Sequence, residues 1–134
     1  MPLLPNSPES EQAVLSGLML AADRVGRQVL AVLGDGQPFF GLHEAAIFRA
    51  IRDLLGAGKP CDLAAVVSHL ATRGAIEEAG GPMFVADVYQ VSASPETAVH
   101  HAGVVADLAR RRGLIHAAAL IAEIATEAET AAEA

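Results

Sequence analysis

Apolar residues recur along this chain at intervals of three and four, the spacing that places side chains on one face of a helix. Strict alternation, which would indicate strands, does not set the pattern. Five such stripes follow one another: Val14, Leu15, Leu18 and Met19; Val25, Val29, Val32 and Leu33; Ile47, Phe48, Ile51, Leu54 and Leu55; Leu63, Val66, Val67 and Leu70; and Phe84, Val85 and Val88. The pattern predicts a head of five short helices within residues 1–92.

Helix-starting and helix-ending residues bound these stripes. The triplet Ser-Pro-Glu occurs at residues 7–9 and 94–96. Each copy places a serine at the N-cap, a proline at the first helical position and a glutamate near the positive end of the helix dipole. The predicted boundaries are a first helix to about Ala21, a second after Asp23 that ends at Gly34–Gly36, a third over Leu42–Leu55, a fourth capped by Asp62 that ends near Gly74, and a short fifth after Gly80-Gly81-Pro82.

The second triplet opens the longest predicted helix, over residues 93–126. It runs for roughly 30 residues, well above the average helix length. A head of this size cannot cover such a helix, so its C-terminal half should project and leave an apolar side for a partner. That side consists of Leu114, Ile115, Ala118, Ala119, Ile121 and Ala122. Residues 127–134 are rich in Ala and Glu, which predicts a frayed tail. Residues 1–134 are therefore interpreted as a single domain.

The composition supports an all-α fold and narrows the function. Apolar residues make up 52% of the chain but aromatic residues only 4%, so Ala, Leu and Val supply the core. This composition favours helices over strands. One cysteine excludes an intrachain disulfide. No apolar run is long enough for a membrane span and no signal peptide is evident, so we expect a cytoplasmic protein without membrane contact.

The net charge of −7 argues against direct nucleic-acid binding, which depends on Lys and Arg neutralising phosphates. The basic cluster Arg110-Arg111-Arg112 has Asp107 nearby and is interpreted as a solvated helix face. A free-standing regulator that binds DNA through a helix-turn-helix stays open as an alternative, although no basic recognition helix is present.

Three patterns suggest chemistry but lack a necessary part. Residues 56–60 resemble a Walker A fragment, yet Asp53 and Pro60 stand where that motif needs Gly and Ser or Thr. The five histidines lack metal-ligand spacing, and Glu96 with His100 is better interpreted as a helix pair. Cys61 precedes a helix N-terminus, where a thiol pKa can fall, but no His is adjacent in sequence. We therefore expect no catalytic residue, no cofactor and no metal in this chain.

Residues 9–20 read ESEQAVLSGLML after a proline-bearing arm. This segment resembles the opening helix, E-x-E-Q-x-V-L-G, of the N-terminal domain of the DnaB replicative helicase family. Further similar motifs follow in order: Phe39-Phe40 with Ile47-Phe48, Gly58–Leu63, Gly74–Gly81 followed by Phe84, His101–Val105 and Arg112–Ile115. Glu44, Ser16, Thr97 and His101 depart from the family's usual residues, most of them at expected surface or cap positions.

The resemblance implies a helicase collar domain whose long helix is one arm of a helical hairpin. It implies a dimer, and a trimer of dimers in the parent helicase, with primase and a helicase loader as partners. ATP and Mg²⁺ would be used by a C-terminal ATPase domain that this chain is too short to contain. The predicted protein interface consists of Glu9, Phe84, His101, Leu108, Arg112, Ile115, Ala119 and Ile121.

Overall fold

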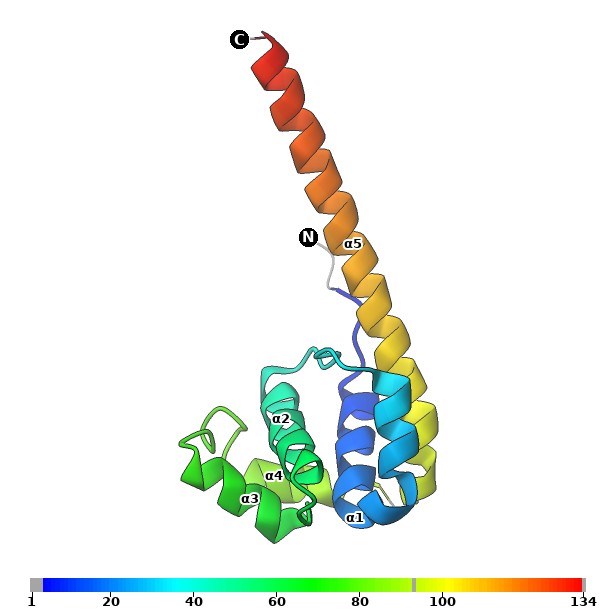
Figure 1. Cartoon of the computed structure of the whole chain (residues 1–134), viewed down its shortest axis with the longest axis vertical. Coiled ribbons are helices and arrows are strands. Elements are labelled where there is room, and N and C mark those ends of the chain that lie inside the picture. The colour runs from blue at the N-terminus through cyan, green and yellow to red at the C-terminus, as the bar shows by residue number, and fades with distance from the viewer. Residues whose placement is uncertain (1–3, 93, 134) are drawn as a thin grey trace.

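The computed structural model describes residues 4–92 and 94–133. Within these ranges the chain forms five α-helices and one 3-10 turn (Figure 1). The elements are α1 (Pro8–Leu33), α2 (Leu42–Gly56), α3 (Leu63–Thr72), α4 (Pro82–Tyr89), the 3-10 turn η1 (Pro95–Thr97) and α5 (Ala98–Glu133). The all-α prediction is confirmed, with α1–α4 forming the head. None of the described helices has the length and hydropathy needed to cross a bilayer.

Helix α1 contains the first two predicted helices, which meet at Ala21. The backbone there is non-helical, with φ −150° and ψ 47°. The two halves of α1 consequently lie side by side in Figure 1, because the chain doubles back at this residue. The predicted break between the first and second helices is therefore confirmed.

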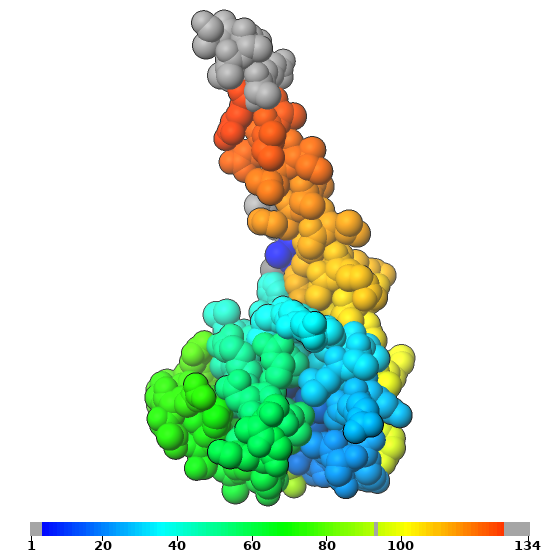
Figure 2. Space-filling model, viewed as in Figure 1, coloured from blue at the N-terminus to red at the C-terminus, as the bar shows by residue number. Residues whose placement is uncertain are grey.

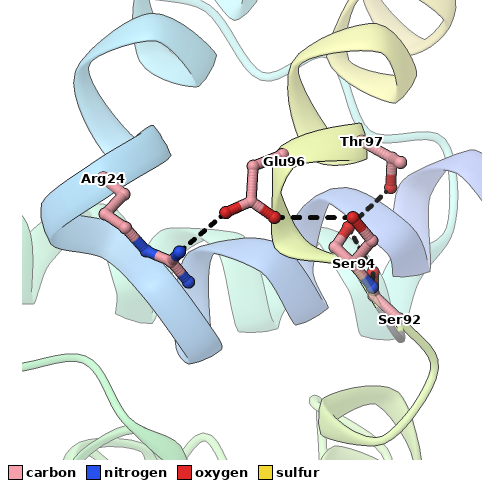
Figure 3. Close-up of polar contacts among 5 residues, drawn as sticks. All are labelled: Arg24, Ser92, Ser94, Glu96 and Thr97. Carbon is pink, nitrogen blue, oxygen red and sulfur yellow. Dashed lines mark hydrogen bonds and ion pairs between the residues drawn. The ribbon is translucent and has the colours of Figure 1, made fainter.

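The three predicted serine and aspartate residues all stand at N-cap positions, and two of them form a side-chain cap bond. Ser7 accepts a hydrogen bond from the Ser10 amide at 3.2 Å, and Asp62 accepts one from the Ala65 amide at 2.9 Å. Ser94 makes no side-chain cap bond. Its hydroxyl instead donates to Glu96 at 3.4 Å, so the predicted N-cap position is confirmed but the side-chain cap bond is not formed (Figure 3).

The predicted pair of Glu96 and His100 is also wrong. Glu96 forms an ion pair with Arg24 of α1 at 2.7 Å, and the His100 ring packs against His101 with 5.4 Å between ring centroids. Figure 3 shows Glu96 reaching toward Arg24. The reason is that Glu96 lies in the 3-10 turn, whose three-residue winding does not give the i, i+4 geometry of an α-helix.

The predicted stripes form the core, with one exception. Phe48, Ile47 and Ile51 are fully buried, and the Phe48 ring packs on Phe39 at 4.6 Å between centroids. Val32 is exposed, contrary to prediction, because it lines a surface hollow between the end of α1 and α5. Several partly buried apolar side chains pack against this core: Leu30, Leu55, Leu63, Val67, Ile76 and Phe84.

The first part of α5 packs against α1 through small residues. Ala98, Ala102 and Ala106 are buried together with Val105. The helices approach so closely that a Cβ added at Gly17 would lie 2.5 Å from the Ala98 Cβ.

Ser16, beside this crossing, is fully buried rather than at the surface or a cap. Its hydroxyl donates to the Tyr89 carbonyl at 2.8 Å and accepts from the Ser92 amide at 3.1 Å. Both of its polar roles are thus satisfied inside the fold, and the expectation of a surface position does not hold for this residue.

Beyond Arg112, α5 leaves the head, as Figures 1 and 2 show. Every residue from 113 to 127 is exposed, so the predicted projection is confirmed. The helix continues to Glu133 and so extends over most of the segment predicted as a frayed tail. Ala134 and the side chains of residues 128–134 lie outside the described part of the structure.

Candidate functional site

Five large apolar side chains are exposed on the projecting part of α5. Their exposed fractions are 71% for Leu114, 47% for Ile115, 47% for Leu120, 66% for Ile121 and 57% for Ile124. We call these five residues the distal face. Sequence analysis identified Leu114, Ile115 and Ile121 but missed the other two, although their i, i+4 spacing was a readable signal.

The distal face is broad, and part of it continues the side of α5 that is buried against the head. Taking 3.6 residues per turn, its five residues span roughly 220° of the helix circumference. Leu120 and Ile124 lie about five helical turns beyond Ala102 and Ala106, which are buried against the head. The remaining sector carries His116 and Glu123. The exposure of the distal face therefore results from the projection of α5 beyond the head.

The width of the distal face limits what can cover it. A surface helix typically presents an apolar stripe of about 100° or more to the rest of its fold. The distal face is about twice as wide, so burying it requires at least two neighbouring helices. A helix bundle meets this requirement, whereas a single partner helix does not.

Arg112 lies where α5 leaves the head. Its guanidinium donates to the carbonyl oxygens of Pro5 at 2.8 Å and Pro38 at 2.7 Å. It also stacks over the Phe40 ring, 5.1 Å from the ring centroid. Arg112, which sequence analysis assigned to the interface, thus connects the N-terminal arm, the loop before α2 and α5 within one chain.

The other two arginines of the basic cluster pair with Asp107. The distances are 3.9 Å from Arg110 and 3.1 Å from Arg111, both between exposed side chains. The solvated helix face predicted for these two residues is confirmed. All three arginines of the cluster therefore have acceptors within the chain.

Glu11 is a structural residue that sequence analysis did not identify. Its buried carboxylate accepts hydrogen bonds from the amides of Phe40 at 2.7 Å and Gly41 at 3.0 Å. Burial raises the pKa of Glu11 above its ordinary value, the neighbouring Glu44 adds to this, and the two hydrogen bonds and Arg112 oppose it. The sequence around Glu11 does not predict its contact with residues 40 and 41, because that contact depends on the tertiary fold.

The remaining predicted interface residues lie on three parts of the molecule. Ala119 is exposed beside the distal face, and Leu108 is half-buried on α5. His101 is half-buried, with its Nδ1 3.0 Å from the Ser10 hydroxyl. Phe84, on α4, is half-buried with its ring 5.3 Å from His43, while Glu9 is exposed in the first turn of α1. Their contact with a partner stays a prediction.

Cys61 is buried and donates to the Leu18 carbonyl at 3.3 Å. Burial raises the pKa of its thiol to about 11, with Asp62 contributing, so the nearby helix N-terminus does not activate it. Among the described residues, no group of three His, Cys, Asp or Glu side chains is placed to hold a metal ion.

Comparisons with known proteins agree with the all-α fold. The family model described as DnaB-like helicase N terminal domain matches residues 3–107. The chain is 32% identical over 113 residues to the replicative DNA helicase DnaB of Mycobacterium leprae, covering 84% of the chain but 18% of that helicase. It is 33% identical over 112 residues to the same protein of Buchnera aphidicola, covering 84% of the chain and 23% of that protein.

A solved structure is also similar over most of the chain. It is the crystal structure of the N-terminal domain of DnaB helicase from Mycobacterium tuberculosis, with a TM-score of 0.83 and 27% identity. The alignment covers 90% of this chain and 86% of that one. The chain thus spans about a fifth of the length of the helicases it matches, at their N-terminal domain.

Proposed function

The chain belongs to the DnaB-like helicase N-terminal domain family, and on that premise we propose that it is the non-catalytic collar domain of a replicative helicase. In this role it joins helicase subunits to one another and binds primase and the helicase loader during DNA replication in the cytoplasm. The distal face of α5 is the observation that carries this proposal, because it is an apolar surface that its own chain leaves uncovered.

Self-association is the first part of the proposal. Large apolar side chains on a projecting helix favour a partner that removes them from water, at about 25 cal/mol per Å² of apolar surface. The width of the distal face favours a bundle, which two copies of the long helix can form with further helices. The family resemblance implies a dimer, and a trimer of dimers in the whole helicase.

Sedimentation over a range of concentrations tests self-association. Ile121→Asp should shift the chain toward the monomer, because it places an unpaired charge in a desolvated contact. His116→Asp is the matched control: it introduces the same side chain on the exposed sector outside the distal face and should leave association unchanged. A parent chain that is monomeric at high concentration would contradict the proposal.

Primase docking is the second part. We propose that the helical C-terminal domain of the primase binds a surface that includes Ile115 and Ile121, with Phe84 and Glu9 nearby. Exposed branched side chains can act as anchors, and an acidic residue at the rim adds orientation. Calorimetry with that primase domain should show binding abolished by Ile115→Asp and weakened in a salt-dependent way by Glu9→Lys. Unchanged binding by Ile115→Asp would place the docking surface elsewhere.

ATP hydrolysis and DNA binding belong to other parts of the parent enzyme in this proposal. We expect the chain alone to be inert with ATP and Mg²⁺. It should also bind duplex and single-stranded DNA weakly near physiological salt, because a net charge of −7 leaves little counterion release. Sub-micromolar DNA affinity at that salt would favour the alternative of a small DNA-binding regulator.

A further inference from the structure

Two contacts bound the segment of α5 that packs on the head. The first is its crossing with α1, where Gly17 and Ala98 approach so closely that no side chain fits at Gly17. The second is Arg112, about 21 Å further along at 1.5 Å per residue. Between them α5 stays packed on the head, because Ala102, Val105 and Ala106 are buried and the His101 Nδ1 lies 3.0 Å from the Ser10 hydroxyl. Arg112 therefore lies at the end of the packed segment, where the helix leaves the head.

Arg112 attaches α5 through three contacts in different directions. Two of its N–H groups reach the Pro5 and Pro38 carbonyls, and its plane covers the Phe40 ring. A planar guanidinium is suited to such an arrangement, because it combines several donors with a stacking face. Lysine, a point charge, would keep only part of these contacts.

The loop under Arg112 is held from its other side by Glu11 of α1. Phe40 is fixed twice, since its amide donates to Glu11 while its ring lies beneath Arg112. The second amide held by Glu11 belongs to Gly41, the N-cap residue of α2. Helices α1, α2 and α5 are therefore connected through the single segment Pro38–Gly41.

We propose that Glu11 and Arg112 form a latch that closes on the segment Pro38–Gly41 and fixes the direction in which α5 leaves the head. Arg112 is hydrogen-bonded to the head, and the exposed stretch of α5 begins directly after it at Gly113. The helix then extends about 30 Å to Glu133, at 1.5 Å per residue. A small rotation about the Ala98 crossing therefore moves the distal face a long way.

The latch adds a conformational element to the proposed function. With the latch closed, the distal face has one direction relative to the head. With the latch open, the distal face takes a range of directions relative to the head. The core of the head is retained, because neither Glu11 nor Arg112 belongs to the apolar cluster around Phe48. This property resides within one chain and does not depend on which partner covers the distal face.

Pulsed EPR distances within one chain test the latch. Spin labels at Thr72→Cys and Glu123→Cys report the head and the projecting helix, since both positions are exposed. A second pair, at Arg27→Cys and Thr72→Cys, reports distances within the head. All chains carry Cys61→Ala, and labelled chain is diluted in excess unlabelled chain so that self-association does not contribute.

We expect a narrow distribution between positions 72 and 123 in the parent. Arg112→Gln and Glu11→Gln should each broaden it by about twofold or more, because a lever rising 1.5 Å per residue amplifies rotation at its base. Arg112→Lys should fall in between. The matched control is Arg111→Gln, which loses the same charge from an exposed pair with Asp107 and should leave the width unchanged.

Two outcomes would overturn the latch. One is a distribution of parental width between positions 72 and 123 in both Arg112→Gln and Glu11→Gln. The other is equal broadening of the distance within the head, which would mean that these residues maintain the head itself. A within-head distance that stays narrow while the head-to-helix distance broadens is the result that the latch requires.

Discussion

Ile51 and Ile121 are the same residue type on the same kind of helical stripe, yet Ile51 is fully buried and Ile121 is 66% exposed. In the head, apolar stripes are surrounded by four helices of the same chain. The distal half of α5 projects from the head, and its own apolar side chains stay exposed (Figure 2). The comparison shows that an apolar helical pattern predicts which side chains need to be buried. It does not predict whether they are buried by the same chain or by a partner.

The two regions should therefore respond differently to the same class of substitution. Burying an aliphatic or aromatic side chain contributes about 1.5–3 kcal/mol to stability. Head residues make this contribution in each chain alone, while residues of the distal face make it only when a partner is bound. Unfolding and association measurements thus separate the two regions.

The largest expected effect is that of Phe48→Ala. Phe48 is fully buried against Phe39, so truncating it should lower the free energy of unfolding by about 3–5 kcal/mol. Urea unfolding at a concentration below self-association measures this. Ile121→Ala should change the same quantity by less than about 0.5 kcal/mol. A large loss from Ile121→Ala in the dilute chain would show that the distal face is covered within the chain.

Two helical glycines sharpen the comparison further. A Cβ at Gly17 would meet the Ala98 Cβ at 2.5 Å and the Pro95 carbonyl at 3.2 Å, so Gly17→Ala should destabilise the head by about 1–3 kcal/mol. Gly113 has open space around it, and Gly113→Ala should instead stabilise α5, by up to about 1 kcal/mol. Thermal unfolding of both variants gives the test, and destabilisation by Gly113→Ala would mean that a neighbour packs there.

Local sequence signals predicted the parts of the fold that depend on local contacts. The helix starts at Ser7 and Asp62, the break near Ala21 and the stripe through Phe48 each arise within a few neighbouring residues. The exposed direction of α5 followed from its length, because the head is too small to cover it. For these features, the spacing of residues along the sequence is enough to determine where their side chains lie relative to one another.

Contacts between distant segments were not predictable in the same way. Glu11 meets the amides of Phe40 and Gly41 across 29 and 30 residues, and Arg112 reaches Pro5 across 107 residues. Both residues were visible only as parts of a family motif or a basic cluster. Val32 shows the opposite error: its spacing is that of a core residue, but its side chain lines a surface hollow and is exposed.

Glu11 allows a pH test of the junction between the two regions. Burial raises the pKa of Glu11 in the folded state above its ordinary value of 4.5, so in the interval between the two values the folded chain holds a proton that the unfolded chain has lost. The stability that Glu11 contributes is then fully present below pH 4.5 and falls as pH rises through the raised pKa. The difference in unfolding free energy between parent and Glu11→Gln should therefore shift in favour of the variant with rising pH.

Urea unfolding of both chains from pH 4 to pH 7 measures this difference, and the other carboxylates cancel in the comparison. Glu9→Gln is a suitable control, because Glu9 is exposed in the same helical turn. A difference between parent and Glu11→Gln that moves in favour of the parent as pH rises would show that the hydrogen bonds and Arg112 outweigh burial at this carboxylate.

The smallest expected effect concerns Arg24 and Glu96, which join α1 to η1 at 2.7 Å (Figure 3). Both side chains are more than half exposed, so solvent screens the pair and ordering two long side chains offsets much of its energy. A double-mutant cycle with Arg24→Ala and Glu96→Ala should give a coupling below about 1 kcal/mol.

The junction at Arg112 differs because its guanidinium is partly buried and has three attachments. Arg112→Ala should consequently cost more stability than Arg24→Ala in the same urea experiment. Equal costs would show that Arg112 behaves as an ordinary surface cation, and the distinction between the two contacts would then be lost.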